Sequence, residues 1–492
     1  MRELKKKPIE SKLWNQDLSP IDIDKRNWHK WNVAALWVGM AVNIPTYMLG
    51  SGLIGSGMNW WQAILTIILG NLIVLVPMML VGHAGTKYGI PFPVFLRSCF
   101  GTEGARVASL LRAFVACGWF GILTWIGGNS IYQLLLIVFP VFAQSYYFSG
   151  FIGLNVEQLS CFLAFWFLQM VILRYGMRAV KHLTVFAAPL LLGFGIALLI
   201  WAWVKVGSFH KILGASYTLS QGKHAQIWSI FWPGLTSVIG FWSTLALNIL
   251  DFTRFARSQK DQALGHLIGL PPAMAFYSFL GIVVTSATVL IFGKAIWDPV
   301  ILLSQFKVPF LIFIGLFAIG LATMCCNVTA NVVSAANDFS NFWPKQISFT
   351  TGCMITGVVG ILICPWKLIA DPQGYIFRWL LAYSSLLGAV GGIMLCDYYL
   401  LRKTHIDLHD LFQHEGKYTF YRGWNRNAFL AFGVAIIPCV PGFLVKVGAV
   451  SEKFFPNYLV ILYDYAWFVA LASAFLTYYA LMRRALKREQ LL

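Results

Sequence analysis

Long apolar runs separated by short polar segments dominate the sequence. Many of these runs reach about twenty residues, the length that an α-helix needs to cross the hydrocarbon core of a bilayer. The alternation therefore predicts an all-α polytopic membrane protein with about twelve transmembrane helices. The predicted helices cover residues 34–55, 61–81, 107–133, 158–174, 183–204, 227–249, 267–292, 309–335, 349–364, 377–401, 428–446 and 457–482.

The composition supports this interpretation and excludes several others. Of the 492 residues, 58% are hydrophobic and 11% are charged, whereas about a quarter of a soluble globular protein is charged. The net charge of +18 could suit nucleic acid, but the basic residues form no continuous stripe. The nine cysteines show no CxxC spacing, so neither a disulfide framework nor a metal site is predicted. We expect the lipid bilayer as the surroundings, no nucleic-acid partner and no cofactor.

The lysine and arginine residues indicate how the helices are oriented. With a cytoplasmic N-terminus, roughly three quarters of the 37 basic residues lie on the cytoplasmic side, as the positive-inside rule requires. The first thirty residues are polar and basic, so they lack the apolar core of a cleavable signal peptide. We therefore predict a plasma (inner) membrane protein with both termini in the cytoplasm.

Two predicted helices contain helix-breaking residues at membrane depth. Asn43-Ile44-Pro45-Thr46 interrupts the first helix, and Gly240 precedes Phe241-Trp242 in the sixth. Each alone could be an ordinary kink or a packing glycine. Because the two helices are equivalent members of two five-helix halves, the pair favours an inverted-repeat transporter with a binding site at the midplane. The predicted organisation is an N-terminal cytoplasmic segment at 1–33, five-helix repeats at 34–204 and 227–401, a cytoplasmic loop at 402–427, two further helices within 428–482 and a cytoplasmic tail at 483–492.

Amide side chains lie inside the predicted spans without a charged residue at the centre. Asn43 lies in the first helix, and Asn327 and Asn331 share one face of the eighth because they are four residues apart. Such amides can simply join neighbouring helices. Because an ionised ligand would require an opposite charge nearby, amides and indoles instead favour a neutral, hydrogen-bonding ligand. A membrane enzyme would need a nucleophile, metal ligands or paired carboxylates at this depth, and the sequence shows none there. A channel would need polar rings along a pore, whereas the paired helix breaks favour a closed midplane site.

Five segments, in order along the chain, carry a resemblance to a known family: His83–Pro93 (HAGTKYGIPFP), Trp119-Phe120-Gly121, Asp251–Ala256 (DFTRFA), Asn327–Asn331 and Asp397-Tyr398-Tyr399. Through them, residues 15 to 482 resemble the nucleobase:cation symporter-1 family of permeases for cytosine, uracil, allantoin, purines, thiamine and hydantoins. The resemblance implies a leucine-transporter-like fold of ten core helices in two inverted repeats plus two more. It also implies import of a nucleobase-like compound by alternating access, and a transporter rather than an enzyme.

The resemblance further implies a set of substrate-binding residues. In the family, the ligand ring stacks between an indole of helix 3 and an indole of helix 6, which correspond here to Trp119 and Trp242. Rim hydrogen bonds come from amides that correspond to Asn43 and Asn331. Many relatives have Gln four residues after the first Trp, where this chain has Leu123, so one rim hydrogen bond is missing. Phe241 and Asn327 complete the candidate set.

A sodium site is also implied by the resemblance. Its ligands would be the backbone carbonyls of Gly39, Val42 and Ala322 and two hydroxyl groups, whose positions are occupied here by Cys325 and Cys326. Sodium is a hard cation that prefers oxygen, and a thiol is a poor substitute. We therefore expect proton-coupled import by a monomer, although no buried carboxylate is evident in the sequence as the proton carrier. Sodium-coupled symport of the same substrates is the alternative.

Overall fold

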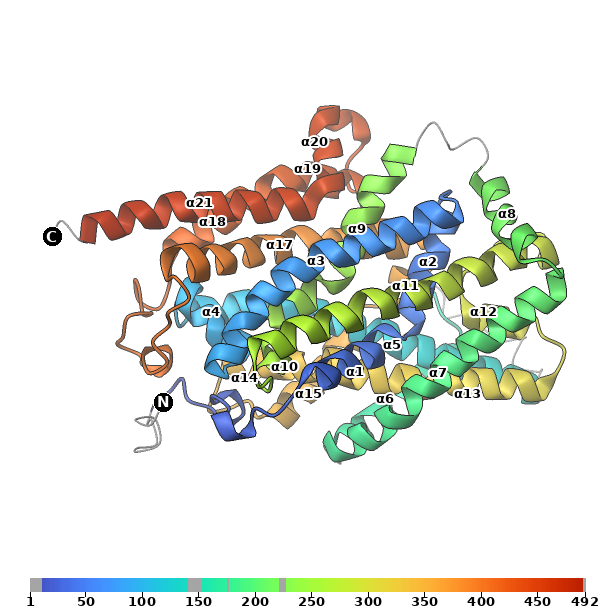
Figure 1. The fold of residues 1–492 in the computed structure, drawn as a ribbon, viewed down its shortest axis with the longest axis horizontal. Helices are drawn as coiled ribbons and strands as arrows, with labels where there is room; N and C mark the ends of the chain where they lie inside the picture. Colours follow the sequence, from blue (N-terminus) through green and yellow to red (C-terminus); the bar gives the residue numbers. More distant parts are fainter. Residues whose placement is uncertain (1–10, 140–152, 175–176, 221–226, 490–492) are drawn as a thin grey trace.

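The computed structural model describes residues 11–139, 153–174, 177–220 and 227–489, and within these ranges the regular structure is helical. The long helices lie beside one another along one direction (Figure 1). Both chain ends lie at the same end of this bundle, and the short helices α8 (Phe209–Ser220) and α20 (Asn457–Leu462) lie at the other. Two chain ends on one side agree with an even number of membrane crossings.

The first half of the described chain contains α1 (Lys30–Ala41), α2 (Ile44–Gly55), α3 (Trp60–Tyr88), α4 (Phe92–Phe100), α5 (Gly104–Val138), α6 (Val156–Arg174), α7 (Met177–Val206) and α8. The second half contains α9 (Ile227–Asn248), α10 (Leu250–Thr253), α11 (Gln259–Phe292), α12 (Pro299–Ser304), α13 (Pro309–Asn327), η6 (Val328–Val332), α14 (Val333–Phe342), α15 (Phe349–Leu362), α16 (Pro365–Leu368), η7 (Gln373–Leu380), α17 (Leu381–Leu395) and η8 (Cys396–Leu401). The C-terminal part contains α18 (Arg426–Ile436), α19 (Val440–Lys446), α20 and α21 (Ala466–Glu489). The segments η6, η7 and η8 are π-helical.

The predicted apolar runs coincide with the long helices. Among the described residues, ten helices are long and apolar enough to cross a membrane, and α1 with α2 forms an eleventh candidate. The predicted ninth span corresponds to α15, an apolar helix of 14 residues. Twelve spans therefore remain a prediction. The short helices α4, α8 and α12 are not among the predicted elements, because each lies in a connection between apolar runs.

The predicted interruption of the first helix is present. The axes of α1 and α2 differ by 60°. Asn43 between them has an extended backbone, and its Oδ1 accepts a hydrogen bond of 2.7 Å from the backbone N–H of Thr46. An amide at the N-cap satisfies one of the free N–H groups of the new helix, and Pro45 lies in the first turn, where its missing N–H is not needed.

The predicted break at Gly240 in the sixth helix is wrong. Helix α9 runs without interruption from Ile227 to Asn248, and a turn at Ile249 separates it from α10. Gly240 instead permits close packing, because a Cβ atom there would lie 2.5 Å from the carbonyl oxygen of Leu380. Small residues commonly allow two helices to approach in this way, and the sequence does not distinguish such a glycine from a helix breaker.

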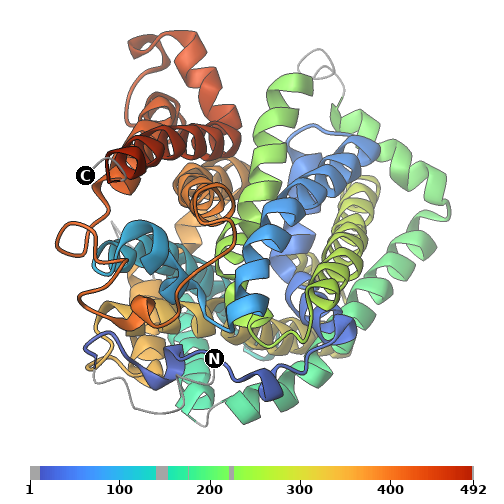
Figure 2. The same cartoon turned by 60° about the vertical axis from the view of Figure 1, so that its left-hand side comes forward.

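Packing between the two halves brings the interrupted helix to the centre of the bundle. Helix α11 packs against α1, α2 and α3, while α5 packs against α13, α14 and α15. Helices α3 and α9 lie side by side in both views (Figure 2). The break between α1 and α2 lies beside residues of α5, α9 and η6 in the interior.

Candidate functional site

A small cavity lies where the break between α1 and α2 meets α5, α9 and η6. Its volume is about 30 Å³, well below the several hundred cubic ångströms that are typical of a ligand pocket. A heterocyclic ring is several times larger, so binding one requires the lining side chains to move apart. The lining residues are Met40, Asn43, Pro45, Trp119, Leu123, Phe241, Trp242, Thr244, Leu245, Cys326, Ala330 and Asn331. Six of the seven predicted substrate-binding residues meet here, and Asn327 is the exception.

Aromatic rings form much of the cavity wall. Phe241 contacts both indoles, with its ring centroid 5.0 Å from that of Trp119 and 4.9 Å from that of Trp242. Both contacts are edge-to-face, a favourable geometry for aromatic pairs. The indole N–H of Trp119 donates a hydrogen bond of 3.2 Å to the hydroxyl of Tyr383, which fixes the direction of that ring. Phe241 therefore joins the two indoles in one aromatic cluster.

A buried amide network lies directly behind the cavity. The Nδ2 of Asn327 donates to the backbone carbonyl of Phe120 at 3.0 Å and to Oε1 of Gln169 at 2.8 Å. The Nε2 of Gln169 donates to the hydroxyl of Thr124 at 3.0 Å. Asn331 in turn donates from Nδ2 to Oδ1 of Asn327 at 2.9 Å.

The network determines which atom of Asn331 is left for a ligand. A backbone carbonyl only accepts hydrogen bonds, so the carbonyl of Phe120 requires the Nδ2 atom of Asn327 on its side. The Oδ1 atom of Asn327 therefore faces Asn331 and accepts from its Nδ2 atom. Asn331, which lines the cavity, keeps its carbonyl oxygen and the second N–H of Nδ2 without a hydrogen-bond partner among the described residues.

Gln169 and Asn327 are both fully buried and lie outside the cavity lining. Gln169 is not among the predicted site residues, although a polar residue inside the predicted span 158–174 is a signal that the sequence offers. Asn327 was predicted to contact substrate. In the structure its side chain forms hydrogen bonds with α5, α6 and Asn331 instead.

The hydrogen bonds of Asn43 are largely used to hold the break between α1 and α2. Its Oδ1 caps α2, and its Nδ2 donates to the carbonyl of Met40. The same Nδ2 lies 3.7 Å from the sulfur of Cys326. Asn43 therefore borders the cavity while it also connects the end of α1 to α13.

Part of the predicted cation site lies beside this break. Cys325 and Cys326 are 3% and 4% exposed, and Val42 forms the C-cap of α1. The thiol of Cys326 donates to the carbonyl of Met40 at 3.7 Å, between the predicted ligands Gly39 and Val42. Within the described ranges, no group of three or more His, Cys, Asp or Glu residues could hold a metal ion. The thiol thus supplies a donor where a cation would need an oxygen acceptor.

Several charged residues are buried in the interior. Arg112 pairs with Asp338 at 3.3 Å, and Arg402 pairs with Asp397 at 2.6 Å. Asp251 accepts a hydrogen bond from the backbone N–H of Phe92 at 3.0 Å. The three carboxylates are at most 5% exposed, so the structure reveals buried carboxylates where none was evident in the sequence as a proton carrier. Asp251 and Asp338 lie just beyond predicted spans, and α14 continues the eighth helix past its predicted end at 335.

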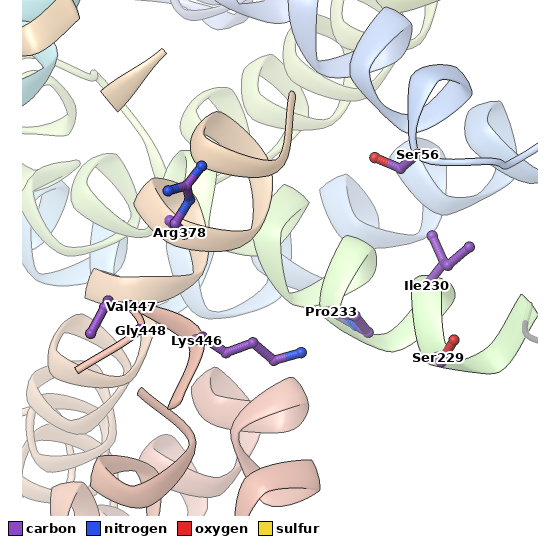
Figure 3. A pocket seen from close by; sticks show the side chains of 8 residues that line it. All are labelled: Ser56, Ser229, Ile230, Pro233, Arg378, Lys446, Val447 and Gly448. Atoms are coloured by element: carbon purple, nitrogen blue, oxygen red, sulfur yellow. The ribbon is translucent and has the colours of Figure 1, made fainter. Parts of the chain in front are cut away.

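A second cavity, of about 360 Å³, lies at the opposite end of the bundle, between α2, α9, η7 and α19 (Figure 3). Arg378 and Lys446 are the charged residues in its lining. Arg378 pairs with Asp371 at 3.0 Å, and Lys446 lies 3.6 Å from a carboxylate oxygen of Asp464. Both cations thus have acidic partners, and none of the predicted site residues lines this cavity.

The model of a family described as permeases for cytosine/purines, uracil, thiamine and allantoin matches residues 20–470. The chain belongs to this permease family. It is 42% identical to the purine-uracil permease NCS1 of Arabidopsis thaliana over 480 residues, which cover 97% of this chain and 79% of that protein. It is 38% identical to the allantoin permease of Bacillus subtilis (strain 168) over 477 residues, which cover 96% and 94%.

The permease also shares its fold with a solved transporter. The inward facing conformation of Mhp1 matches with a TM-score of 0.75 at 24% identity, over 98% of this chain and 96% of that chain. The predicted fold class, an all-α polytopic membrane protein of the leucine-transporter-like type, is thereby confirmed. Because the family consists of permeases, the protein is a multi-pass membrane transporter and not an enzyme.

Proposed function

We propose that this permease imports a neutral, planar, nucleobase-like heterocycle by alternating access. One observation carries the proposal: Trp119, Trp242, Asn43 and Asn331 border a single interior cavity at the break between α1 and α2. None of the twelve described residues that line this cavity is charged. Two aromatic faces and two amides suit a planar ring with N–H and C=O groups on its rim.

The names of relatives support the same chemical class. The similar proteins are a purine-uracil permease and an allantoin permease. Uracil and allantoin carry ring N–H groups next to carbonyls. Because the carbonyl oxygen of the cavity-lining Asn331 has no partner among the described residues, we infer that the substrate presents a ring N–H to it.

We further propose that uptake is coupled to protons rather than to sodium. The predicted sodium ligands Cys325 and Cys326 are thiols, and the thiol of Cys326 already donates to the end of α1. Asp251 and Asp338 are buried carboxylates that could exchange a proton during the transport cycle. The alternative is sodium-coupled symport, with the carbonyls of Gly39, Val42 and Ala322 as the remaining ligands.

We also infer that the permease acts as a monomer in a plasma (inner) membrane, with both termini in the cytoplasm. Both chain ends lie at the same end of the bundle (Figure 1), and the basic residues favour that end as the cytoplasmic one.

Uptake into proteoliposomes tests the transport proposal. Radiolabelled uracil and allantoin would each be offered with unlabelled uracil, cytosine, allantoin, hydantoins or purines as competitors. A carrier gives saturable uptake and counterflow, whereas a channel gives neither. In the Trp119→Ala variant, the preferred ring should no longer inhibit uptake of the labelled compound. In the control variant Trp228→Ala, where the side chain is 66% exposed, the inhibition should persist. Absence of saturable uptake for every heterocycle in the panel would refute the proposal.

A further inference from the structure

A tight turn precedes α18 at the end of the bundle that holds the chain termini. Tyr421 and Trp424 exchange backbone hydrogen bonds of 3.3 and 3.0 Å across it. The two residues between them, Arg422 and Gly423, have φ angles of +52° and +88°. Turns of this kind usually contain Asn-Gly, because other side chains are unfavourable at positive φ. Arg422 therefore occupies a strained backbone position.

The strained turn is firmly attached to the helices behind it. The carbonyl of Gly423 accepts hydrogen bonds from the backbone N–H groups of Glu103 and Gly104 at 2.8 and 3.1 Å. The side-chain Nδ2 of Asn425 donates to the carbonyl of Cys99 at 2.7 Å. These contacts fix the turn at the junction of α4 and α5, so Arg422 is held outward. Strain of this kind persists where the surrounding structure imposes it, and it often marks functional sites.

Two positive charges lie around one aromatic ring of the turn. The guanidinium carbon of Arg426 lies 3.7 Å from the ring centroid of Tyr421, and that of Arg422 lies 5.6 Å from it. Neither arginine forms an ion pair with another described residue, and the nearby Glu103 pairs with Arg106 at 2.7 Å. Both guanidinium groups thus lie within 6 Å of one ring centroid without a described acidic partner, and such groups form strong charge-assisted hydrogen bonds with anions.

The arginines border a cavity of about 560 Å³ that continues into an apolar surface. Its lining is Tyr421, Arg422, Trp424, Arg426, Phe429 and Leu430, with no acidic residue among these six. Leu430, Val434 and Ile437 are 54%, 41% and 67% exposed and follow one another along the same face of the helical span Arg426–Lys446. Tryptophan and tyrosine are typical of the membrane interface at headgroup level. The site thus combines a cationic head with an apolar stripe leading into the bilayer.

We propose that this cavity binds the headgroup of an anionic phospholipid, whose acyl chain lies along Leu430, Val434 and Ile437. The phosphodiester would lie between Arg422 and Arg426, because a guanidinium pairs well with phosphate oxygens. Free phosphate would use the arginines but not the stripe, so the exposed face favours a lipid. With cytoplasmic chain ends, the lipid belongs to the cytoplasmic leaflet, where anionic lipids attract basic residues. This site is independent of the proposed substrate and of the coupling ion.

Lipid binding to the purified full-length protein in detergent tests the proposal. Native mass spectrometry would compare phosphatidylglycerol with phosphatidylcholine of identical acyl chains. Each arginine near an anionic membrane surface contributes about fivefold to binding, so Arg422→Gln with Arg426→Gln should lower the phosphatidylglycerol preference by roughly 25-fold. The matched control is Arg483→Gln with Arg484→Gln, which removes the same charge from exposed positions on α21 at the same end of the bundle. The control should keep the preference.

Further arms distinguish the lipid from other anions and from misfolding. Arg422→Lys with Arg426→Lys keeps both charges and should retain most of the preference, which makes the test robust if the glutamine variant folds poorly. Glycerophosphoglycerol, the same headgroup without acyl chains, should not displace the lipid at equal concentration. An unchanged preference in the glutamine variant, an equal loss in the control or displacement by the soluble headgroup would each overturn the proposal.

Discussion

Replacing Asn327 by Leu separates a positioning role from substrate contact. The substitution removes the hydrogen bonds that Asn327 donates to Phe120 and Gln169 and the one that it accepts from Asn331. Oε1 of Gln169 and Nδ2 of Asn331 then lose these partners in a buried region. An unpaired buried polar group costs about 1 to 3 kcal/mol, although hydrogen bonds between membrane helices average only about 0.6 kcal/mol. The expected destabilisation is therefore about 1 to 4 kcal/mol.

Substrate selectivity should change in a way that destabilisation alone does not explain. In the parent, N-methylation of the ring N–H that meets Asn331 leaves its carbonyl oxygen unpaired. The methylated ring should bind roughly five- to a hundredfold more weakly. Without Asn327, the amide of Asn331 can turn over and present either its oxygen or its nitrogen. The ratio of the affinity for the unmethylated ring to the affinity for the methylated ring should then fall toward one.

Competition against labelled substrate in proteoliposomes measures this ratio. The competitors are uracil, 1-methyluracil and 3-methyluracil, and thermal unfolding in detergent reports stability for each variant. The matched control is Asn71→Leu, because Asn71 is also fully buried but donates within α3 to the carbonyl of Ile67 at 2.7 Å. If Asn327→Leu keeps the parental ratio while Asn331→Leu alters it, Asn327 does not position Asn331. If the parent transports uracil and both methylated rings compete as strongly as uracil does, the orientation assigned to Asn331 is wrong.

Three further predictions concern stacking, coupling and pH. Trp119→Ala and Trp242→Ala should each weaken binding about five- to a hundredfold while Phe replacements retain more, and alanine variants with parental affinity would place the stacking site elsewhere. Uptake should be nearly independent of a sodium gradient, and Cys325→Ser with Cys326→Thr should create sodium sensitivity by restoring oxygen ligands; a steep sodium dependence of the parent would contradict this. Burial raises the pKa of Asp298 from 3.8 to about 6, so its contribution to stability is present at low pH and is lost as the pH rises through about 6. Asp298→Asn should remove this part of the pH dependence in unfolding experiments between about pH 4 and 7, and an unchanged profile would show that Asp298 does not titrate there.

Much of the fold follows from local sequence patterns. Apolar runs of membrane length had to become helices, because backbone groups in lipid can only be satisfied internally. The break at Asn43 and Pro45 was also predictable, because an N-capping amide followed by proline is a local signal for a new helix. The indoles and amides around the cavity could be named from motifs, and the structure brings Trp119, Trp242 and Asn331 together.

Only the tertiary structure decided how the remaining residues are used. The sequence around Gly240 looks the same whether the glycine interrupts a helix or allows another segment to pack closely against it. In the structure the carbonyl of Leu380 packs against Gly240, so the second role applies. Asn327 faces the same side of its helix as Asn331, but Gln169 from a distant helix occupies it. Asp338 became a buried ion pair because α14 continues the helix toward Arg112. Each outcome depends on which groups from distant segments meet in the interior, and hydrophobic periodicity along one segment carries no information about that.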